Sequence, residues 1–129
     1  SPYPNVFEPT SRAADATTKR SEGFQAYEQK NYQQAATLFK ALLAEKKEPE
    51  ILFLLGNTNL MLDQTTEARE NFATLINDFD DMDLQAKWFL SLSYLKSDDR
   101  ENARKVLKEL GETENSYASK AKELLKEID

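Results

Sequence analysis

Residues 78–83 read DFDDMD, so four aspartates fall within six positions. Clustered carboxylate oxygens of this kind are ligands that calcium prefers. An EF-hand loop would also need aspartate or asparagine at its fifth place, glycine at its sixth and glutamate at its twelfth. Counted from Asp78, those places hold Met82, Asp83 and Phe89. The mismatch at all three places predicts that this run is not a calcium site.

A loop between two helices is the alternative interpretation of residues 78–83. Aspartates at the start of a helix are favoured by capping and by the helix dipole. The two apolar residues of the run, Phe79 and Met82, would turn inward while the acids face water. We therefore predict that the run lengthens the joint between two helical units.

The composition excludes most small catalytic and metal sites. The chain of 129 residues contains neither cysteine nor histidine, which removes Cys/His zinc sites, nucleophile–histidine pairs and disulfides. We predict no enzymatic activity, no cofactor and no bound metal. The net charge of −6 disfavours nucleic acid, which requires a basic surface. No apolar run reaches the roughly 18 residues that direct membrane insertion needs.

The prolines divide the chain into two parts. Three of the four lie in the first nine residues, so residues 1–12 are predicted to be extended. Residues 13–129 contain only Pro49 and carry apolar residues at helical spacing, which predicts one all-α domain with seven helices. Asp98, with Glu101 three residues later, predicts a capping-box start for the sixth helix, and Gly111 predicts its C-cap.

The strongest pattern is an internal repeat. Residues 23–42 align with residues 56–75 at an offset of 33, and residues 91–110 align at a further offset of 35. The aligned positions are Gly23, Gly56 and Ser91; Ala35, Ala68 and Ala103; Phe39, Phe72 and Leu107; and Leu42, Leu75 and Leu110. Helix–turn–helix units at this period form an α-solenoid, in which stacked copies bury a continuous core. We predict repeats over about residues 16–48, 49–80 and 83–112, and a capping helix over about residues 115–128.

The small residue at the first aligned position has a predicted packing role. Glycine or serine there would let the second helix of the pair approach closely, beside the small alanine. The phenylalanine or leucine four residues after that alanine would fill the space one turn along.

The repeat resembles the tetratricopeptide repeat (TPR) family, whose pattern is W-x2-L-G-x2-Y, then A-x3-F, then P. The matching segments are Leu55-Gly56 with Ala68-x3-Phe72, Gly23 with Ala35-x3-Phe39, and Leu90-Ser91-x2-Tyr94 with Ala103-x3-Leu107. No repeat has the first aromatic in register, and Ser91 replaces glycine. The resemblance covers about residues 16–110. It implies three TPR-like helix–turn–helix repeats plus a C-terminal capping helix, and a non-catalytic domain that binds protein or peptide.

The resemblance also implies a concave groove lined by the first helix of each pair. The corresponding residues are Arg20, Phe24 and Tyr27; Phe53, Asn57 and Leu60; and Trp88, Leu92 and Leu95. A peptide or partner helix would anchor on this aromatic and aliphatic trough. The alternative is that the apolar members are core between repeats. A carboxylate clamp of the kind that some family members use is not expected, because Phe53, Gln85 and Phe89 occupy its basic positions.

A second hypothesis places residues 3–7 of this chain, or of a neighbouring molecule, in the groove. The chain would then be a structural or self-assembly domain of a larger envelope protein, with weak self-association. The sequence of the last repeats resembles TPR domains of Gram-negative bacterial proteins, which favours a periplasmic or envelope-associated setting over a cytoplasmic one. The partner, the compartment and an upstream anchor stay open.

Overall fold

The computed structural model describes the backbone of residues 8–129 and the side chains of residues 15–129. This part of the chain forms seven helices and no strand. The helices are α1 (Glu8–Glu28), α2 (Tyr32–Glu45), α3 (Pro49–Met61), α4 (Thr65–Asp78), α5 (Asp83–Lys96), α6 (Arg100–Gly111) and α7 (Ala118–Ile128). The predictions of an all-α fold and of seven helices are confirmed.

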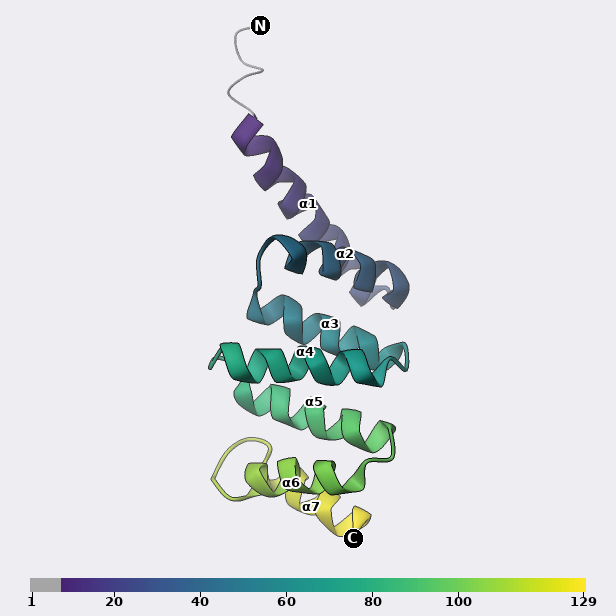
Figure 1. Ribbon diagram of the computed structural model, residues 1–129, viewed down its shortest axis with the longest axis vertical. Helices are drawn as coiled ribbons and strands as arrows, with labels where there is room; N and C mark the ends of the chain where they lie inside the picture. The colour runs from purple at the N-terminus through teal and green to yellow at the C-terminus, as the bar shows by residue number, and fades with distance from the viewer. Residues whose placement is uncertain (1–7) are drawn as a thin grey trace, which may run out of the picture.

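The helices stack in chain order. Each packs on the helix before and the helix after it, and α3 also contacts α5. Figure 1 shows the stack running from α1 and α2 at one end to α6 and α7 at the other. The buried core is accordingly divided into clusters along the stack rather than gathered at one centre. Packing between neighbours only is the arrangement of an α-solenoid.

The first helix begins earlier than the prolines predict. The sequence predicts an extended segment over residues 1–12, but α1 starts at Glu8 and residues 8–12 are helical. Pro9 is the second residue of the helix, where its missing N–H has no partner within the helix and its fixed φ suits the first turn. The rest of the predicted segment, residues 1–7, lies outside the described residues. Figure 1 shows the N-terminal part of α1 projecting beyond α2.

The turn inside each helical pair has the same backbone geometry. Lys30, Asp63 and Asp98 adopt the left-handed conformation, with φ of 63°, 59° and 60°. In each turn the next N–H donates to the carbonyl five residues before it, at 2.8 Å. These bonds join Asn31 to Ala26, Gln64 to Asn59 and Asp99 to Tyr94. This bond is the signature of the Schellman motif, so the sequence repeat is also a repeat of turn geometry.

Replacing Lys30 with glycine is expected to stabilise the domain by about 1 kcal/mol, because a left-handed conformation costs an L-residue about 1–2 kcal/mol. Lys30 is exposed and forms no ion pair within residues 15–129, so the change removes no such contact. Denaturant unfolding measures the effect. Lys40→Gly, in the middle of α2, is the matched control and should lower stability by about 1 kcal/mol. Equal losses from both changes would contradict the expectation.

The cap of α6 lies one residue later than the predicted capping box. Asp98 occupies the left-handed turn, and Asp99 is the N-cap. The Asp99 carboxylate accepts hydrogen bonds from the side-chain amide of Asn102 at 2.7 Å and from its backbone N–H at 3.2 Å. These bonds lower the pKa of Asp99, the side-chain bond most. Gly111, the predicted C-cap, is the last helical residue, and Glu112 caps the helix instead.

The predicted close approach of the helices is confirmed in the first two repeats. A Cβ at Gly23 would lie 2.8 Å from Cε1 of Phe39, and a Cβ at Gly56 would lie 2.5 Å from Cε1 of Phe72. Both phenylalanines are wholly buried. The third repeat, which has leucine in place of phenylalanine, accommodates the buried Ser91.

The aspartate run forms the joint between α4 and α5, as predicted. Phe79 and Met82 pack against the buried cluster of Leu52, Leu75 and Ala86. The capping part of the prediction is wrong, because the N-cap of α5 is Met82, which makes no side-chain cap bond. Asp83 does lie in the first turn of α5, where the helix dipole favours a carboxylate. Asp78 pairs with Lys47 at 3.1 Å. Within residues 8–129 no three carboxylates of the chain gather in a geometry that could hold a metal ion.

Candidate functional site

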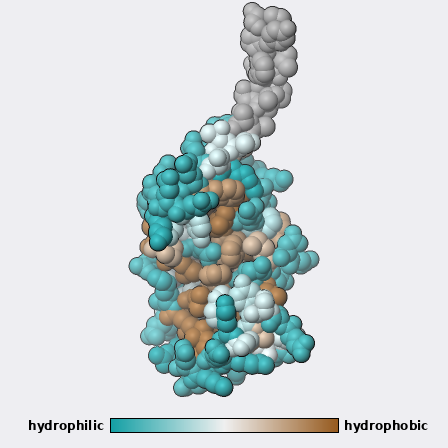
Figure 2. Space-filling model, turned by 180° about the vertical axis from the view of Figure 1, so that it is seen from behind, coloured by the Kyte–Doolittle hydropathy of each residue, from teal (hydrophilic) through white to brown (hydrophobic). Residues whose placement is uncertain are grey.

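One face of the stack carries a band of hydrophobic residues between hydrophilic margins. Figure 2 shows this face, which points away from the viewer in Figure 1. Such a band on a solenoid marks a surface that a partner can cover.

Two pockets lie between residues of the first helices of the pairs. Pocket A has a volume of about 390 Å³ and is lined by Tyr27, Glu28, Lys30, Tyr32, Asn57, Leu60, Met61 and Phe89. Pocket B has a volume of about 310 Å³ and is lined by Phe24, Tyr27, Glu28, Glu50 and Leu54. Tyr27 and Glu28 line both, so the pockets adjoin, and we call the two together the groove.

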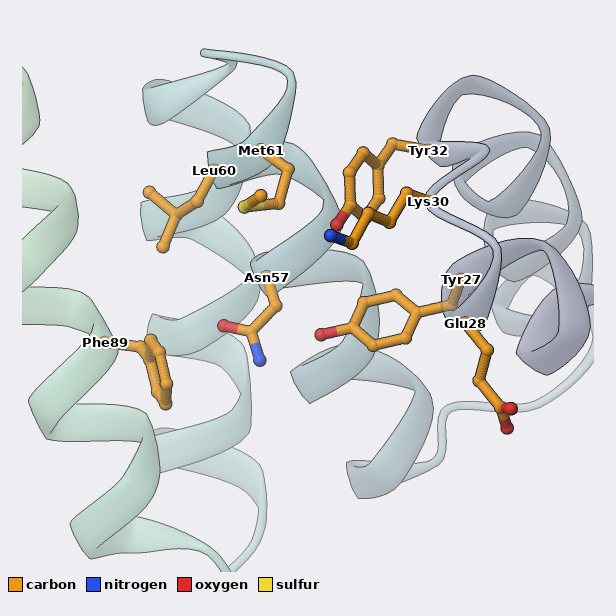
Figure 3. A pocket seen from close by; sticks show the side chains of 8 residues that line it. All are labelled: Tyr27, Glu28, Lys30, Tyr32, Asn57, Leu60, Met61 and Phe89. Carbon is orange, nitrogen blue, oxygen red and sulfur yellow. The ribbon is translucent and has the colours of Figure 1, made fainter.

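Pocket A is lined by residues of four helices, α1, α2, α3 and α5, and by Lys30 of the turn between α1 and α2. Figure 3 shows Tyr27 of α1 pointing toward Asn57 of α3, with Phe89 of α5 on the far side of Asn57. Burial raises the pKa of the Tyr27 hydroxyl, and the Asn57 side chain partly opposes that shift. The Oδ1 atom of Asn57 is buried and accepts no hydrogen bond from residues 15–129. A buried acceptor without a partner is costly, so the pocket can reward a ligand that brings a donor.

Pocket B has an apolar wall and an acidic margin. Phe24 packs on the buried Phe39 with ring centroids 6.1 Å apart, and Leu54 faces it from α3. Glu28 and Glu50 supply the carboxylates. The pocket can therefore receive an apolar side chain next to a polar or charged one.

Four of the predicted groove residues meet in the two pockets, and a fifth lies beside them. Phe24, Tyr27, Asn57 and Leu60 line the pockets. Arg20 lies over the Phe24 ring, 5.4 Å from its centroid, and pairs with Glu48 and Glu50. Its guanidinium is thus occupied by carboxylates of this chain.

The four other predicted groove residues line neither pocket. Phe53 packs on the rings of Phe72 and Phe89, with centroids 6.2 and 5.4 Å away, and so joins repeats to each other. Trp88 packs on Tyr117, with centroids 5.8 Å apart, in the cluster beside α7. Leu92 is half-buried. Leu95, the ninth residue of the predicted trough, is also half-buried and lines neither pocket.

Sequence reasoning missed Leu54, Met61 and Phe89. The predicted trough consists of the residues three before, one after and four after the glycine or serine of each repeat. Leu54 and Phe89 lie two residues before that position, and Met61 lies five after it. The sequence does contain a signal for Leu54 and Met61. They are spaced i, i+3, i+7 with Asn57, so the three residues share one face of a helix. Met61 is 58 % exposed, which is high for a large hydrophobic residue.

The comparisons with known proteins concern the repeat and the fold. A family model described as the tetratricopeptide repeat matches residues 50–81, which hold α3, α4 and the turn between them. Residues 50–81 therefore form a tetratricopeptide repeat, and the predicted resemblance of the chain to the TPR family is confirmed. TPR domains act in protein–protein interaction, so this chain is a protein-interaction module at that general level.

A solved structure shares the TPR fold of this chain. It is a chain of a CopN–Scc3 complex, 23 % identical, and it matches with a TM-score of 0.72 over 98 % of this chain and 72 % of that one. At this identity the likeness shows the fold alone. No curated protein matches the chain. Within residues 8–129 of the TPR domain, each helix is too short or too polar to span a bilayer.

Proposed function

We propose that this TPR domain is a non-catalytic scaffold that binds a segment of a partner protein in the groove. The observation that carries the proposal is the pair of adjoining pockets, which hold half-buried aromatic rings, the exposed Met61 and the unpartnered Oδ1 of Asn57. Apolar anchors combined with a few convergent polar groups are the usual composition of a peptide-binding site.

The groove suits a peptide better than a small molecule. Its two pockets adjoin at Tyr27, and a bound chain that passes this ring could place one side chain in each. Aromatic rings held by the core provide contact area with little loss of conformational freedom, which favours binding. Tyr27 is held in this way, since its ring lies 6.1 Å from Tyr32 and 6.4 Å from Phe39.

Peptides selected from a displayed random library against the domain are expected to lose at least about tenfold in affinity on Met61→Ser. The expected loss follows from removal of an apolar contact worth roughly 1–2 kcal/mol at the pocket. Fluorescence anisotropy with the selected peptides measures it. Because Met61 is already exposed, the change should leave the unfolding midpoint nearly unaltered.

Leu84→Ser is the matched control. Leu84 is the other exposed large hydrophobic residue within residues 15–129, and it lines neither pocket. Its replacement should leave the affinity unchanged. Selected peptides that bind equally well to the wild type and to Met61→Ser would place binding elsewhere and overturn the proposal.

The alternative occupant, residues 3–7 of the same molecule, is disfavoured by reach. Along α1, Glu8 and Phe24 are separated by about 24 Å, and Glu8 and Tyr27 by about 28 Å, at 1.5 Å per residue. Even fully extended, Tyr3 can lie only about 18 Å from Glu8. This shortfall favours the corresponding segment of a neighbouring molecule as the alternative occupant of the groove. Sedimentation velocity of the chain with and without residues 1–7 tests that arrangement, which requires loss of self-association on deletion.

A further inference from the structure

Acidic side chains border the groove at pocket B. Glu28 lines both pockets, and Glu50 lines pocket B. Glu28 is exposed and forms no ion pair within residues 15–129. Its carboxylate is therefore available to a ligand.

The one nearby guanidinium does not neutralise this margin. Nη1 of Arg20 lies 2.7 Å from Oε2 of Glu48, and Nη2 lies 3.2 Å from Oε2 of Glu50. Arg20 is thus shared between two carboxylates. Glu48 lies outside pocket B, whose own lining has two carboxylates, Glu28 and Glu50, and no cationic side chain.

The charge within the groove is uneven. Lys30 lines pocket A, where apart from Glu28 the other lining residues are uncharged. The positive charge therefore lies at pocket A and the excess negative charge at pocket B. A ligand that crosses both pockets meets different charges at its two ends, and this difference can fix its direction.

We propose that the bound partner segment carries lysine or arginine beside an apolar side chain. This inference rests on the proposed function. The apolar side chain fits against Phe24 and Leu54 in pocket B, and the neighbouring cation pairs with Glu28 and Glu50 at its margin. Segments that place aspartate or glutamate there meet like charge and are rejected. The overall charge of −6 acts in the same direction by attracting basic partners from a distance.

Three fluorescein-labelled peptides of equal length test the inference by anisotropy. The first has leucine and phenylalanine anchors flanked by lysines, the second has the same anchors flanked by glutamates, and the third has the lysines with serine at the anchor positions. The first is expected to bind about tenfold more tightly than the second, since two rim ion pairs worth a few-fold each multiply to about that factor. Added salt should narrow the difference because it screens the rim charges.

The double variant Glu28→Gln, Glu50→Gln is expected to lose this tenfold preference. The matched control is Glu67→Gln, Glu70→Gln, which removes the same charge from exposed positions on α4 and should keep it. Equal binding of the first two peptides, or an unchanged preference in the Glu28/Glu50 variant, would overturn the inference. So would equal binding of the first and third peptides, or no binding of the first at about 1 mM.

The same assay separates this inference from the proposed function. If Met61→Ser weakens all peptides that bind but charge makes no difference, groove binding stands and the basic partner is wrong. If the lysine-flanked peptide keeps its charge preference in the Glu28/Glu50 variant and also ignores Met61→Ser, its site is not the groove, and both proposals fail.

Discussion

Gly56→Ala is expected to destabilise the domain by about 2 kcal/mol. A Cβ at that position would lie 2.5 Å from Cε1 and 2.6 Å from Cζ of Phe72. The ring of Phe72 is wholly buried and packs on Phe53 and Phe89, with centroids 6.2 and 6.1 Å away, so it has little room to shift. Overpacking of this kind costs up to about 3 kcal/mol, and the better helix propensity of alanine offsets about 1 kcal/mol.

The control for this change is Gly111→Ala. A Cβ there would meet only the exposed and flexible side chain of Lys122, with Cγ at 3.3 Å and Cε at 3.7 Å. The variant should be neutral or up to about 1 kcal/mol more stable, because alanine restricts the unfolded chain. Trp88 is the only tryptophan, so its fluorescence can report unfolding of each variant in denaturant.

The third repeat suggests the rescue of Gly56→Ala. At the positions equivalent to Gly56 and Phe72 it has Ser91 and Leu107, both wholly buried, so leucine is compatible with a Cβ on the facing helix. The double variant Gly56→Ala, Phe72→Leu is therefore expected to be about as stable as Phe72→Leu alone. A double-mutant cycle measures the coupling between the two residues. Simple addition of the two losses would show that the contact is not what makes alanine costly.

The sequence predicts the fold well because the repeat records the packing. The offsets of 33 and 35 reappear as the spacing of the left-handed turns at Lys30, Asp63 and Asp98. The sequence misplaces the start of α1 and the N-cap of α6, and both errors have local causes. Proline at the second residue of α1 is compatible with a helix although proline usually ends one. Asp98 and Asp99 are both aspartates, and only the backbone geometry shows which of them caps α6.

The groove is predicted less well, because spacing identifies a helix face but not what covers it. Phe24 and Phe53 occupy comparable faces of α1 and α3, yet Phe24 lines a pocket and Phe53 packs on two other rings. The difference arises from Phe89, which reaches Phe53 from the next repeat. In the first repeat, the ring of Tyr27 packs on Tyr32 of the same repeat. Pocket A lies between these two rings and Asn57.

Trp88→Ala is expected to destabilise the domain by about 2–3 kcal/mol and to release α7 locally. Trp88 packs against the buried cluster of Leu107, Leu110 and Ala121 and on the ring of Tyr117. Loss of a large aromatic side chain that packs in a core costs about 3–5 kcal/mol when it is fully buried, and Trp88 is half-buried. Since α7 has 11 residues, it is too short to be a stable helix without its tertiary contacts.

Hydrogen exchange can separate this role from a role in the groove. If Trp88 holds the C-terminal end together, its removal should speed exchange of the α7 amides more than that of the α3 and α4 amides. Met61→Ala is the control, since Met61 is exposed and lines the groove, and its loss should change stability by less than about 0.5 kcal/mol. If Trp88→Ala left stability and hydrogen exchange unchanged but weakened peptide binding, Trp88 would be a residue of the binding groove instead. The expected opposite pattern would mean that α7 covers the last repeat and confines the binding surface to the pockets between α1, α3 and α5.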